Sequence, residues 1–385
     1  MTVPRQFATQ EIGSIAKPGW RVKYRQGKKI EDKDLSEARK WGKKIGIPAA
    51  EQETLGKLLR KRTRSAKDKK AVEDFSALYG IRFLEASGLD LVWDGEQRRA
   101  EMYQYPIENA KGFKFLGHVR SWDNKYYLKA ACVATPGLKK PYHTSEFDFI
   151  RTNARREIKV PVTGAFTLAD WSFNEFYERK LAHGDRLSKQ ARHDAKRELA
   201  VAIAKNLVRP TVEALVKAGA TRIQIDEPAA TTKYDETDIF VESFEETVRG
   251  LPGYHSVHLC FSEYKRLFPQ ILEMRSCKQY AMEFANRDSR KPGTRREDRP
   301  GYAFLELMEE YNDDRAVGLG VLDVHSDFVE TPELVRDRLL YAADKLGAER
   351  VFANPDCGLR TRTWETTFAK LAALAEGAQR ARKSL

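Results

Sequence analysis

The sequence predicts an α/β fold in which a single domain, 1–385, forms one (β/α)8 barrel of the TIM type. Short apolar runs alternate with longer stretches of helical period, as expected for βα units around a parallel sheet. Polar residues follow most of these runs directly, and barrels of this type carry their chemistry where the strands end. No repeat, low-complexity tract or obvious linker divides the chain, so one domain is the simplest interpretation.

Composition indicates a globular protein. With 41% hydrophobic and 32% charged residues, the chain can bury a sizeable core. No segment approaches the roughly 18 consecutive apolar residues of a membrane helix. The N-terminal "MTVPRQFATQ" lacks the apolar core of a secretion signal. We therefore expect a cytoplasmic protein with no membrane partner.

The cysteines suggest reduced thiols. There are only four in 385 residues, too few and too scattered for a disulfide framework. Some of them could instead be metal ligands. Cys132 and Cys277 have no comparable ligand types nearby in the pattern, and we expect them to be structural.

The net charge of +12 allows a nucleic acid, an acidic protein or an anionic substrate as partner. The basic residues are spread widely, however, and the one dense run is "KLLRKRTRSAKDKK", 57–70. This run carries no aromatic residue on which bases could stack. A solvated helix face is the favoured interpretation, and a docking patch for a polyanion is the alternative. A nucleic-acid partner is not favoured.

Nine runs read as strands, one more than a barrel of eight requires. The least regular is 113–134, where "WDNK" at 122–125 could turn a hairpin. We therefore expect part of it to be a hairpin excursion from the barrel. The candidate strands are 7–15, 88–96, 113–134, 158–166, 221–227, 254–261, 278–285, 316–323 and 350–356.

Helical stretches lie between and before these runs. The segment from about 20 to 86 reads as helical additions at the N-terminus. In "TPELVRDRLLYAADKLG", Thr331 can cap a helix that Pro332 begins and Gly347 ends. Its apolar stripe predicts a helix packed on the outside of a barrel. The stretch 187–219 is also helical, with a kink or break expected at Pro210.

Several candidate strands end in charged, thiol or imidazole side chains, which is unusual. Because parallel strands of a barrel end at one mouth, these groups should converge there. They are "IGS" at 12–14, "DGE" at 94–96, "DEP" at 226–228, "HLC" at 258–260, "MEF" at 282–284, "DVH" at 323–325 and "NPDC" at 354–357.

Four of these residues predict a zinc site. His258 and Cys260 are two positions apart on one candidate strand, so their side chains point to the same face. Imidazole and thiolate are preferred zinc ligands. Glu283 and Cys357 each stand at the end of a later strand. Four ligands of suitable type would then meet at the C-terminal mouth of the barrel.

Two of the four candidate ligands have simpler interpretations. Cys357 could be a small buried hydrophobe, and Glu283 could pair with Arg287. A closed structural zinc site is a further alternative, but such sites are normally built from cysteine and histidine without a carboxylate. A carboxylate ligand can be displaced or can share an expanded shell, which suits a reactive site.

The charge of this ligand set suggests the role of the metal. Two thiolates and one carboxylate around a dication leave a net charge of about minus one. Such a centre is a poor Lewis acid for activating water, but an incoming thiol would lose its proton on coordination and keep much of its nucleophilicity. The pattern therefore indicates transfer of an alkyl group to a zinc-bound thiolate.

Six segments occur in the order seen in the catalytic half of cobalamin-independent methionine synthase: "TQEIGS", "WDGEQRRAEM", "QIDEPA", "VHLCFSE", "GVLDVHS" and "NPDCGLRTR". The sequence resembles this family over nearly the entire chain, in its short, single-barrel form. The resemblance implies a zinc-containing α/β barrel that methylates the sulfur of homocysteine to give methionine.

The resemblance also implies roles for individual residues. Ile12, Gly13 and Ser14 would hold the carboxylate of the amino acid, and Glu96 and Asp226 would take its ammonium. Two carboxylates would distinguish an amino-acid thiol from an uncharged one. Structural ion pairing is the alternative role for these two acids. The zinc ligands implied by the family are His258, Cys260, Glu283 and Cys357.

The methyl donor is less well defined. Trp171, in "DWSF", matches a tryptophan that stacks on the pterin of a folate donor, and His325 corresponds to the proton donor of the family. Thr232, however, stands where the family has an acidic residue that contacts the folate. The family segment "SYGSRC" also has no clear counterpart beside "HVRSWDNKYY". Methylfolate and a methylated corrinoid on a partner protein both remain as donors.

Two other functions compete with this one. Enzymes that add coenzyme M to an epoxide share the His-x-Cys pair and the distal cysteine of the zinc site. They bind a sulfonate, however, which Glu96 and Asp226 would repel. A zinc-stabilised protein that binds nucleic acid through its basic surface is the rival from another class. Homocysteine should perturb the metal site of an enzyme and leave a structural site unchanged.

Overall fold

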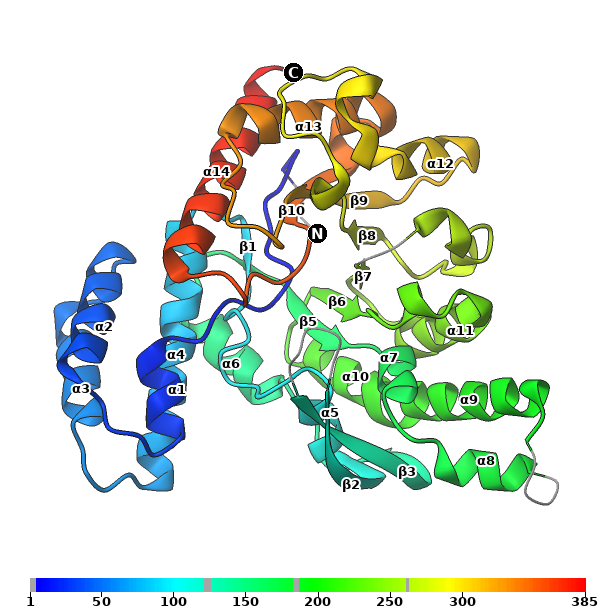
Figure 1. Ribbon diagram of the computed structural model, residues 1–385, viewed down its shortest axis with the longest axis horizontal. Coiled ribbons are helices and arrows are strands. Elements are labelled where there is room, and N and C mark those ends of the chain that lie inside the picture. Colours follow the sequence, from blue (N-terminus) through cyan, green and yellow to red (C-terminus); the bar gives the residue numbers. More distant parts are fainter. Residues whose placement is uncertain (1–4, 121–125, 183–186, 261–262) are drawn as a thin grey trace.

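A computed structural model describes residues 5–120, 126–182, 187–260 and 263–385, and it has an α/β fold (Figure 1). Six parallel strands form the central sheet, in the order β10-β9-β8-β7-β6-β5. Nearly every residue of these strands is buried, as expected for a parallel sheet covered by helices. The strands are β5 (Val160–Thr163), β6 (Arg222–Asp226), β7 (Tyr254–Leu259), β8 (Gln279–Met282), β9 (Ala316–Leu322) and β10 (Val351–Pro355).

The helices that follow the strands lie outside the sheet (Figure 1). The predicted helix at 331–347 is confirmed as α13 (Pro332–Leu346): Thr331 Oγ1 accepts a hydrogen bond from Leu334 N, and Gly347 ends the helix at φ 87°. In the predicted stretch 187–219, a π-helical turn at Ala204–Val208 separates two helices, and Pro210 lies in the first turn of the second. The other outer helices are α7 (Ala165–Asp170), α8 (Glu175–Leu181), α9 (Lys189–Ile203), α10 (Arg209–Lys217), α11 (Thr237–Val248), α12 (Phe304–Glu310) and α14 (Trp364–Lys383).

The predicted strand 7–15 does not form as a strand. Its backbone makes isolated parallel bridges, from Thr9 to Ala353 of β10, from Gln10 to Leu91 and from Ile15 to Leu359. The Thr9 N–H bonds the carboxylate of Asp90 at 3.0 Å, so a side chain takes a place that a neighbouring strand would fill. The segment nevertheless lies between β10 and the short strand that follows Asp90.

The predicted strand 88–96 is also shorter than expected. It forms only β1 (Leu91–Val92), which pairs in parallel with β4 (Glu157–Ile158). The chain then turns sharply, because Gly95 and Glu96 both have positive φ and Asp94 Oδ1 accepts a hydrogen bond from Glu96 N. The predicted strand 158–166 is divided between β4 and β5.

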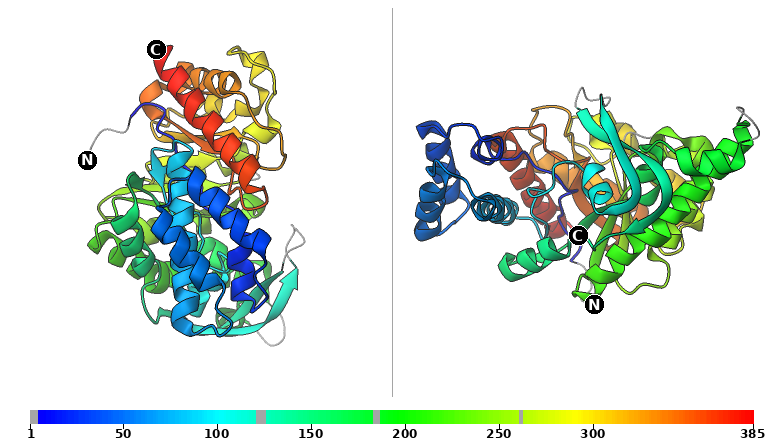
Figure 2. Two further views of the ribbon diagram at one scale, coloured as in Figure 1. Left: turned by 90° about the vertical axis from the view of Figure 1, so that its left-hand side faces the viewer. Right: turned by 90° about the horizontal axis from the view of Figure 1, so that it is seen from below.

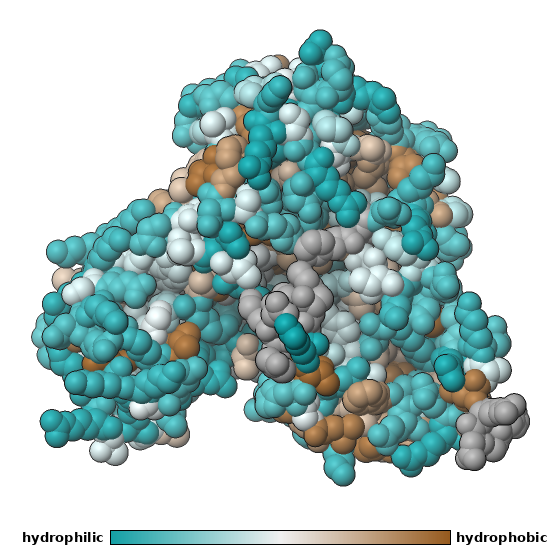
Figure 3. All heavy atoms as spheres, viewed as in Figure 1, coloured by the Kyte–Doolittle hydropathy of each residue, from teal (hydrophilic) through white to brown (hydrophobic). Residues whose placement is uncertain are grey.

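The range 110–138 forms an antiparallel pair, β2 (Ala110–Arg120) and β3 (Tyr126–Leu138), which extends from the body beside α8 (Figures 1 and 2). The turn predicted at 122–125 lies outside the described residues. The face shown in Figure 3 is mostly hydrophilic, but hydrophobic atoms gather over this hairpin. Leu116 and Val133 are among its exposed apolar side chains. Helices α5 (Gln104–Glu108) and α6 (Thr144–Asn153) flank the hairpin in the sequence.

Four helices precede β1: α1 (Gly19–Arg25), α2 (Asp32–Lys44), α3 (Ala49–Leu59) and α4 (Ala66–Ala86). The pair α2 and α3 stands to one side of the body (Figures 1 and 2). The basic run 57–70 was predicted as one helix face, but it spans the end of α3, a turn and the start of α4, and its basic side chains are mostly exposed. Among the described residues, no helix is long and apolar enough to cross a membrane.

Trp41 anchors α2 to the body. It is 2% exposed, and its ring centroid lies 5.4 Å from that of Phe83 and 5.2 Å from that of Trp364. Phe83 belongs to α4 and Trp364 to α14, so one side chain joins three helices. The contact ties the N-terminal helices to the helix that follows β10.

We predict that Trp41→Ala lowers the free energy of unfolding by about 3–5 kcal/mol, because it removes a large buried ring and leaves a cavity. Denaturant unfolding followed by circular dichroism measures the change. Lys33→Ala on the same helix is the control, since the Lys33 side chain is 76% exposed. Equal unfolding midpoints for both variants would show that α2 contributes nothing to the stability of the body.

Candidate metal centre

The parallel register brings the predicted site residues to one end of the sheet. Asp226 of β6 pairs with His258 of β7, which pairs with Ala281 of β8. Ala281 in turn pairs with Gly318 of β9. These four residues therefore lie at one level across the sheet, and the chain segments just beyond them carry the remaining candidates.

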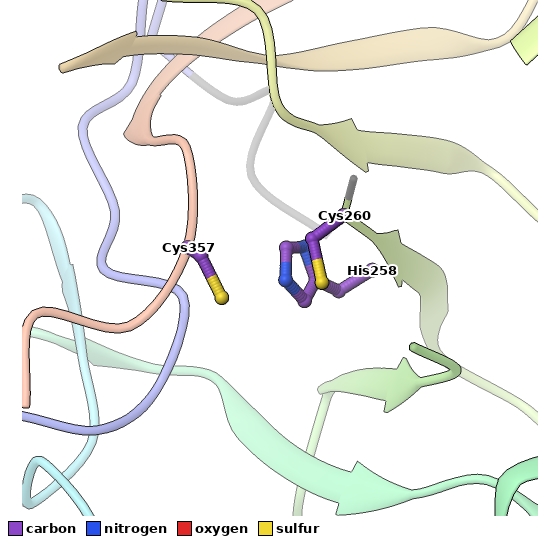
Figure 4. A group of neighbouring side chains, drawn as sticks. All are labelled: His258, Cys260 and Cys357. Carbon is purple, nitrogen blue, oxygen red and sulfur yellow. The ribbon is translucent and has the colours of Figure 1, made fainter. Parts of the chain in front are cut away.

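His258, Cys260 and Cys357 form a compact cluster (Figure 4). Their potential ligand atoms all lie within 4.8 Å of one another. His258 and Cys260 come from β7 and the position just after its end, and Cys357 comes from the turn after β10. In Figure 4 the Cys357 sulfur points toward the other two side chains. Three of the four predicted zinc ligands are thus brought together.

The ring of His258 is oriented for metal binding. Its Nδ1 lies 3.0 Å from the backbone oxygen of Ala281, which accepts the ring N–H. The other nitrogen, Nε2, is buried and has no hydrogen-bond partner among the described residues. A histidine that donates one N–H to a carbonyl and keeps the other nitrogen unprotonated is typical of metal ligands.

The two thiols are coupled. A hydrogen bond to Cys260 lowers the pKa of Cys357 well below its usual range, and the hydrogen bond and charge of Cys357 also raise the pKa of the buried Cys260. Cys357 therefore loses its proton more readily than an isolated thiol would, and Cys260 loses its proton less readily. The nearby His258 imidazole also lowers the pKa of Cys357. A nitrogen and two sulfurs in this state suit a zinc ion.

Glu283 lies beside the cluster but outside the group within 4.8 Å. It follows β8 directly and is 4% exposed. Its Oε1 accepts hydrogen bonds from His325 Nε2, at 3.0 Å, and from Asn286 Nδ2. The carboxylate is close enough to act electrostatically on Cys260.

Asp356 shapes the turn that carries Glu283. Its carboxylate accepts three backbone N–H groups in succession: Phe284 and Ala285 at 2.9 Å and Asn286 at 2.8 Å. Asp356 immediately precedes Cys357, so one residue joins the segment after β10 to the segment after β8. This arrangement fixes Glu283 relative to Cys357.

Asp226 is a buried carboxylate at the same end of the sheet. It is 5% exposed, and burial raises its pKa to about 6, although His258 and Arg99 oppose the rise. Its Oδ1 accepts a hydrogen bond from Gln224 Nε2 at 2.7 Å. The same amide group donates to the backbone oxygen of Ile12, also at 2.7 Å. Asp226 and the "IGS" segment are thus neighbours, as the sequence predicted.

Glu96 occupies a constrained turn against the same segment. Its φ of 60° is unusual for a residue other than glycine. A Cβ atom on Gly13 would lie 2.5 Å from Glu96 Oε1, so a larger residue here would displace the Glu96 carboxylate. The Glu96 carboxylate also forms an ion pair with Arg99, which is 6% exposed.

Ser14 faces the turn after Cys357. Leu359 N donates to Ser14 O at 2.7 Å, and a Cβ on Gly358 would come within 2.4 Å of Ser14 Oγ. The segment that carries Ile12, Gly13 and Ser14 therefore lies against the turn after Cys357 on one side and is joined to Asp226 through Gln224 on the other.

Trp171 lies among aromatic side chains. It caps the end of α7 and is half-buried between Tyr103 and Tyr127, at centroid distances of 6.3 and 5.6 Å. A surface cavity of about 990 Å³ opens beside it, and its lining includes Ser172, Phe173 and Thr232.

His325 follows β9, and its loop is fixed by a buried ion pair. His325 N donates to Asp323 Oδ1 at 2.9 Å. Lys370 Nζ lies 2.9 Å from Glu330 Oε2 and 2.8 Å from Asp323 O, and the other oxygen of Glu330 accepts from Asp323 N. Lys370 and Glu330 are at most 1% exposed. The hydrogen bond that His325 donates to Glu283 raises the pKa of His325, so this imidazole is more easily protonated than usual.

Comparison with known proteins agrees with this geometry. The model of the family described as cobalamin-independent synthase, catalytic domain, matches residues 48–380. The chain belongs to the cobalamin-independent methionine synthase family.

Curated relatives in this family are similar over most of their length. The methionine synthase of Thermoplasma acidophilum is 37% identical over 300 residues, which are 76% of this chain and 84% of the relative. That of Sulfurisphaera tokodaii is 30% identical over 381 residues, which are 98% of this chain and 93% of the relative. The chain therefore corresponds to the short form of the cobalamin-independent methionine synthases.

Solved structures share the fold. A B12-independent methionine synthase from Shewanella sp. W3-18-1, in complex with selenomethionine, superposes with a TM-score of 0.72 at 21% identity, over 99% of both chains. A putative vitamin-B12-independent methionine synthase from Listeria monocytogenes gives a TM-score of 0.64 at 14% identity, over 99% of this chain and 98% of that one.

The sequence analysis did not identify several residues that contribute to this site. Gln224 and Lys159 are polar residues inside buried strand runs, and that placement was a usable signal. Gln224 is also two positions before Asp226, on the same strand face. Arg99 and Asp356 gave no comparable signal, because their roles depend on contacts with residues distant in the sequence.

We predict that Lys370→Met destabilises the protein by about 3–5 kcal/mol, because it leaves the buried Glu330 carboxylate without its cation. Lys40→Met is the control, since Lys40 and Glu365 form an exposed pair worth at most about 1 kcal/mol. Denaturant unfolding measures both. The double change Lys370→Met with Glu330→Leu should recover part of the loss, and no recovery would show that the ion pair is not its cause.

Proposed function

We propose that this protein is a zinc-dependent methyltransferase that transfers a methyl group to the sulfur of homocysteine and so forms methionine. The cluster of His258, Cys260 and Cys357 is the observation that carries this proposal. It combines a metal-oriented imidazole with two coupled thiols at the end of the sheet where the amino-acid candidates lie. Membership of the cobalamin-independent methionine synthase family supports it.

The donor set fits zinc, with a nitrogen and two sulfurs in the cluster and a carboxylate beside it. His258, Cys260 and Cys357 would hold the ion, and Glu283 would be the fourth ligand. When bound, zinc would keep the sulfur of homocysteine as a thiolate at neutral pH. Glu283 also bonds His325, so its carboxylate could be held by the histidine when homocysteine takes a place at the metal.

The amino-acid part of homocysteine would lie between the N-terminal segment and Asp226. Ile12, Gly13 and Ser14 would hold the carboxylate, and Glu96 and Asp226 would take the ammonium. Burial strengthens the case for a cationic ligand, since Asp226 sits in a region where a bare carboxylate is unfavourable. Arg99 already neutralises part of the charge of Glu96, which leaves Asp226 as the stronger partner for the ammonium.

In the transfer itself, a bond forms between sulfur and the methyl carbon while the bond from that carbon to the donor breaks. The thiol proton leaves before the transfer. A folate donor would leave as an amine and needs a proton, which His325 is placed to supply. The hydrogen bond to Glu283 raises the pKa of His325, which favours the protonated imidazole. A corrinoid donor would leave with the electron pair on cobalt and needs no proton.

The donor would be methylfolate or a methylcorrinoid carried by a partner protein. Trp171 favours a pterin, because it offers a half-buried aromatic face next to the cavity. Thr232 lines that cavity and provides no carboxylate for a pterin ring, which favours the corrinoid. We therefore propose the methylcorrinoid as the better donor.

The scaffold of this site would be an eight-stranded (β/α)8 barrel. The N-terminal segment bridges to β10 on one side and to β1 on the other, and β1 pairs with β4, which continues into β5. Together with the six-stranded sheet, these contacts support a closed barrel in which residues 8–10 occupy the position of the first strand.

The rival functions fit less well. A sulfonate thiol such as coenzyme M would meet the Asp226 carboxylate, whose hydrogen bond comes from the neutral amide of Gln224. A structural zinc site in a nucleic-acid-binding protein would not need buried carboxylates beside the metal. The proposed enzyme would act in the cytoplasm, without a membrane or nucleic-acid partner.

We predict about one zinc per chain in the purified protein, and loss of most of it in Cys260→Ser and Cys357→Ser. Cys277→Ser should keep its zinc, because burial raises the pKa of Cys277 to about 12 and its thiol bonds a backbone oxygen away from the site. Metal analysis by mass spectrometry measures all three. Full zinc content in both site variants would exclude this metal centre.

We predict that the zinc-loaded protein forms methionine from homocysteine readily with methylcobalamin and poorly with methylfolate. His325→Asn should reduce any transfer from methylfolate by about 10² to 10⁴, the range typical of a lost general acid, and should affect methylcobalamin far less. Chromatography of methionine measures each rate. Rapid transfer from methylfolate by the unchanged protein would contradict the choice of donor.

A further inference from the structure

One buried side chain joins the two halves of the proposed amino-acid pocket. Gln224 of β6 is fully buried, and its Nε2 donates both to Asp226 Oδ1 and to Ile12 O, each at 2.7 Å. Asp226 belongs to the ammonium end of the pocket and Ile12 to the carboxylate end. Gln224 therefore fixes the distance between the two groups that would hold the amino acid.

Lys159 decides which way the Gln224 amide faces. Its Nζ lies 2.6 Å from Gln224 Oε1 and also donates to the backbone oxygen of Glu11. An ammonium group has only donors, so the amide atom that faces it must be the oxygen. The amide NH2 is then turned toward Asp226 and Ile12. The opposite orientation would place a carbonyl against a carboxylate and an NH2 against an ammonium.

This arrangement leaves one oxygen of Asp226 for a ligand. Gln224 takes Oδ1, and within the described part of the chain Oδ2 has no hydrogen-bond donor. A buried carboxylate is stabilised in its charged form by such a donated hydrogen bond. Lys159, which is 2% exposed, adds a positive charge close behind it. Gln224 thus fixes the orientation of the Asp226 carboxylate through Oδ1 and leaves Oδ2 for a ligand.

We propose that Gln224, oriented by Lys159, is a positioning residue that gives this site its specificity for thiols with a free α-ammonium group. This inference rests on the proposed function, because it assumes that Asp226 binds the ammonium of homocysteine. Gln224 itself touches neither the thiol nor the metal ligands. It acts through Asp226 and Ile12, so its loss should weaken recognition of the amino-acid part and leave recognition of the thiol intact.

Two thiols of equal chain length separate these effects. Homocysteine carries the ammonium, and 4-mercaptobutyrate has the same thiol and carboxylate without it. In calorimetry with zinc-loaded protein, Gln224→Met should raise the Kd for homocysteine by about tenfold to a hundredfold, the usual effect of losing a hydrogen bond to a charged group. The Kd for 4-mercaptobutyrate should rise much less, because this thiol depends on Gln224 only through Ile12 and not through Asp226.

Lys159 provides a second, independent variant. Lys159→Met should shift the Kd for homocysteine in the same direction as Gln224→Met, and Lys159→Arg should restore part of the affinity because it keeps a donor and a charge. Gln279→Met is the matched control. Gln279 is equally buried in β8 and bonds Gln10 at 3.2 Å, with no contact to Asp226 or Ile12, so its variant should keep the preference for homocysteine.

The outcomes are distinct. Unchanged homocysteine affinity in Gln224→Met and Lys159→Met, with zinc retained, would overturn the positioning role. Equal weakening of both thiols would also overturn it, since that result indicates a general disturbance of the pocket. If the unchanged protein bound homocysteine no better than 4-mercaptobutyrate, the proposed function itself would fail, whatever the variants show.

Discussion

The parallel register of β6, β7, β8 and β9 is the constraint on which the site depends. It sets Asp226, His258 and Ala281 at one level, so that the His258 ring can donate to the Ala281 carbonyl and present its other nitrogen to a metal. A shift of one residue in any of these strands would turn its side chains to the opposite face. The cluster with Cys357, the position of Asp226 and the turn that carries Glu283 all follow from this alignment.

Buried negative charge gives the site its chemical character. Burial raises the pKa of Asp226 to about 6 and that of Glu11 to about 7, and Asp226 also acts electrostatically on the Cys260 thiol. Lys159 and Arg99 offset only part of this charge. A site of this kind favours a metal dication and a ligand that carries an ammonium group, and it disfavours anionic substrates. The overall charge of +12 therefore does not predict the preference of the pocket.

The sequence predicted the outer helices and the polar strand ends well, because both depend on local signals: the Thr331 cap, the apolar periodicity of α13, and the two-residue spacing of His258 and Cys260. It predicted strand extent poorly near the N-terminus, where Asp90 bonds the Thr9 backbone and the turn at Glu96 ends β1. It also missed Gln224 and Lys159, because a hydrogen-bonded chain across two strands appears only once their pairing is known. The closure of the barrel and the role of Glu283 stay predictions.

X-ray absorption at the zinc edge, before and after addition of homocysteine, tests the central claim most directly. Our account predicts that the metal in the purified protein has two sulfur ligands at about 2.3 Å, and that homocysteine adds a third. The small amount of zinc that Cys357→Ser retains should begin with one sulfur ligand fewer. An unchanged sulfur count on saturation with homocysteine would contradict the account, since the thiol would then bind away from the metal or not at all.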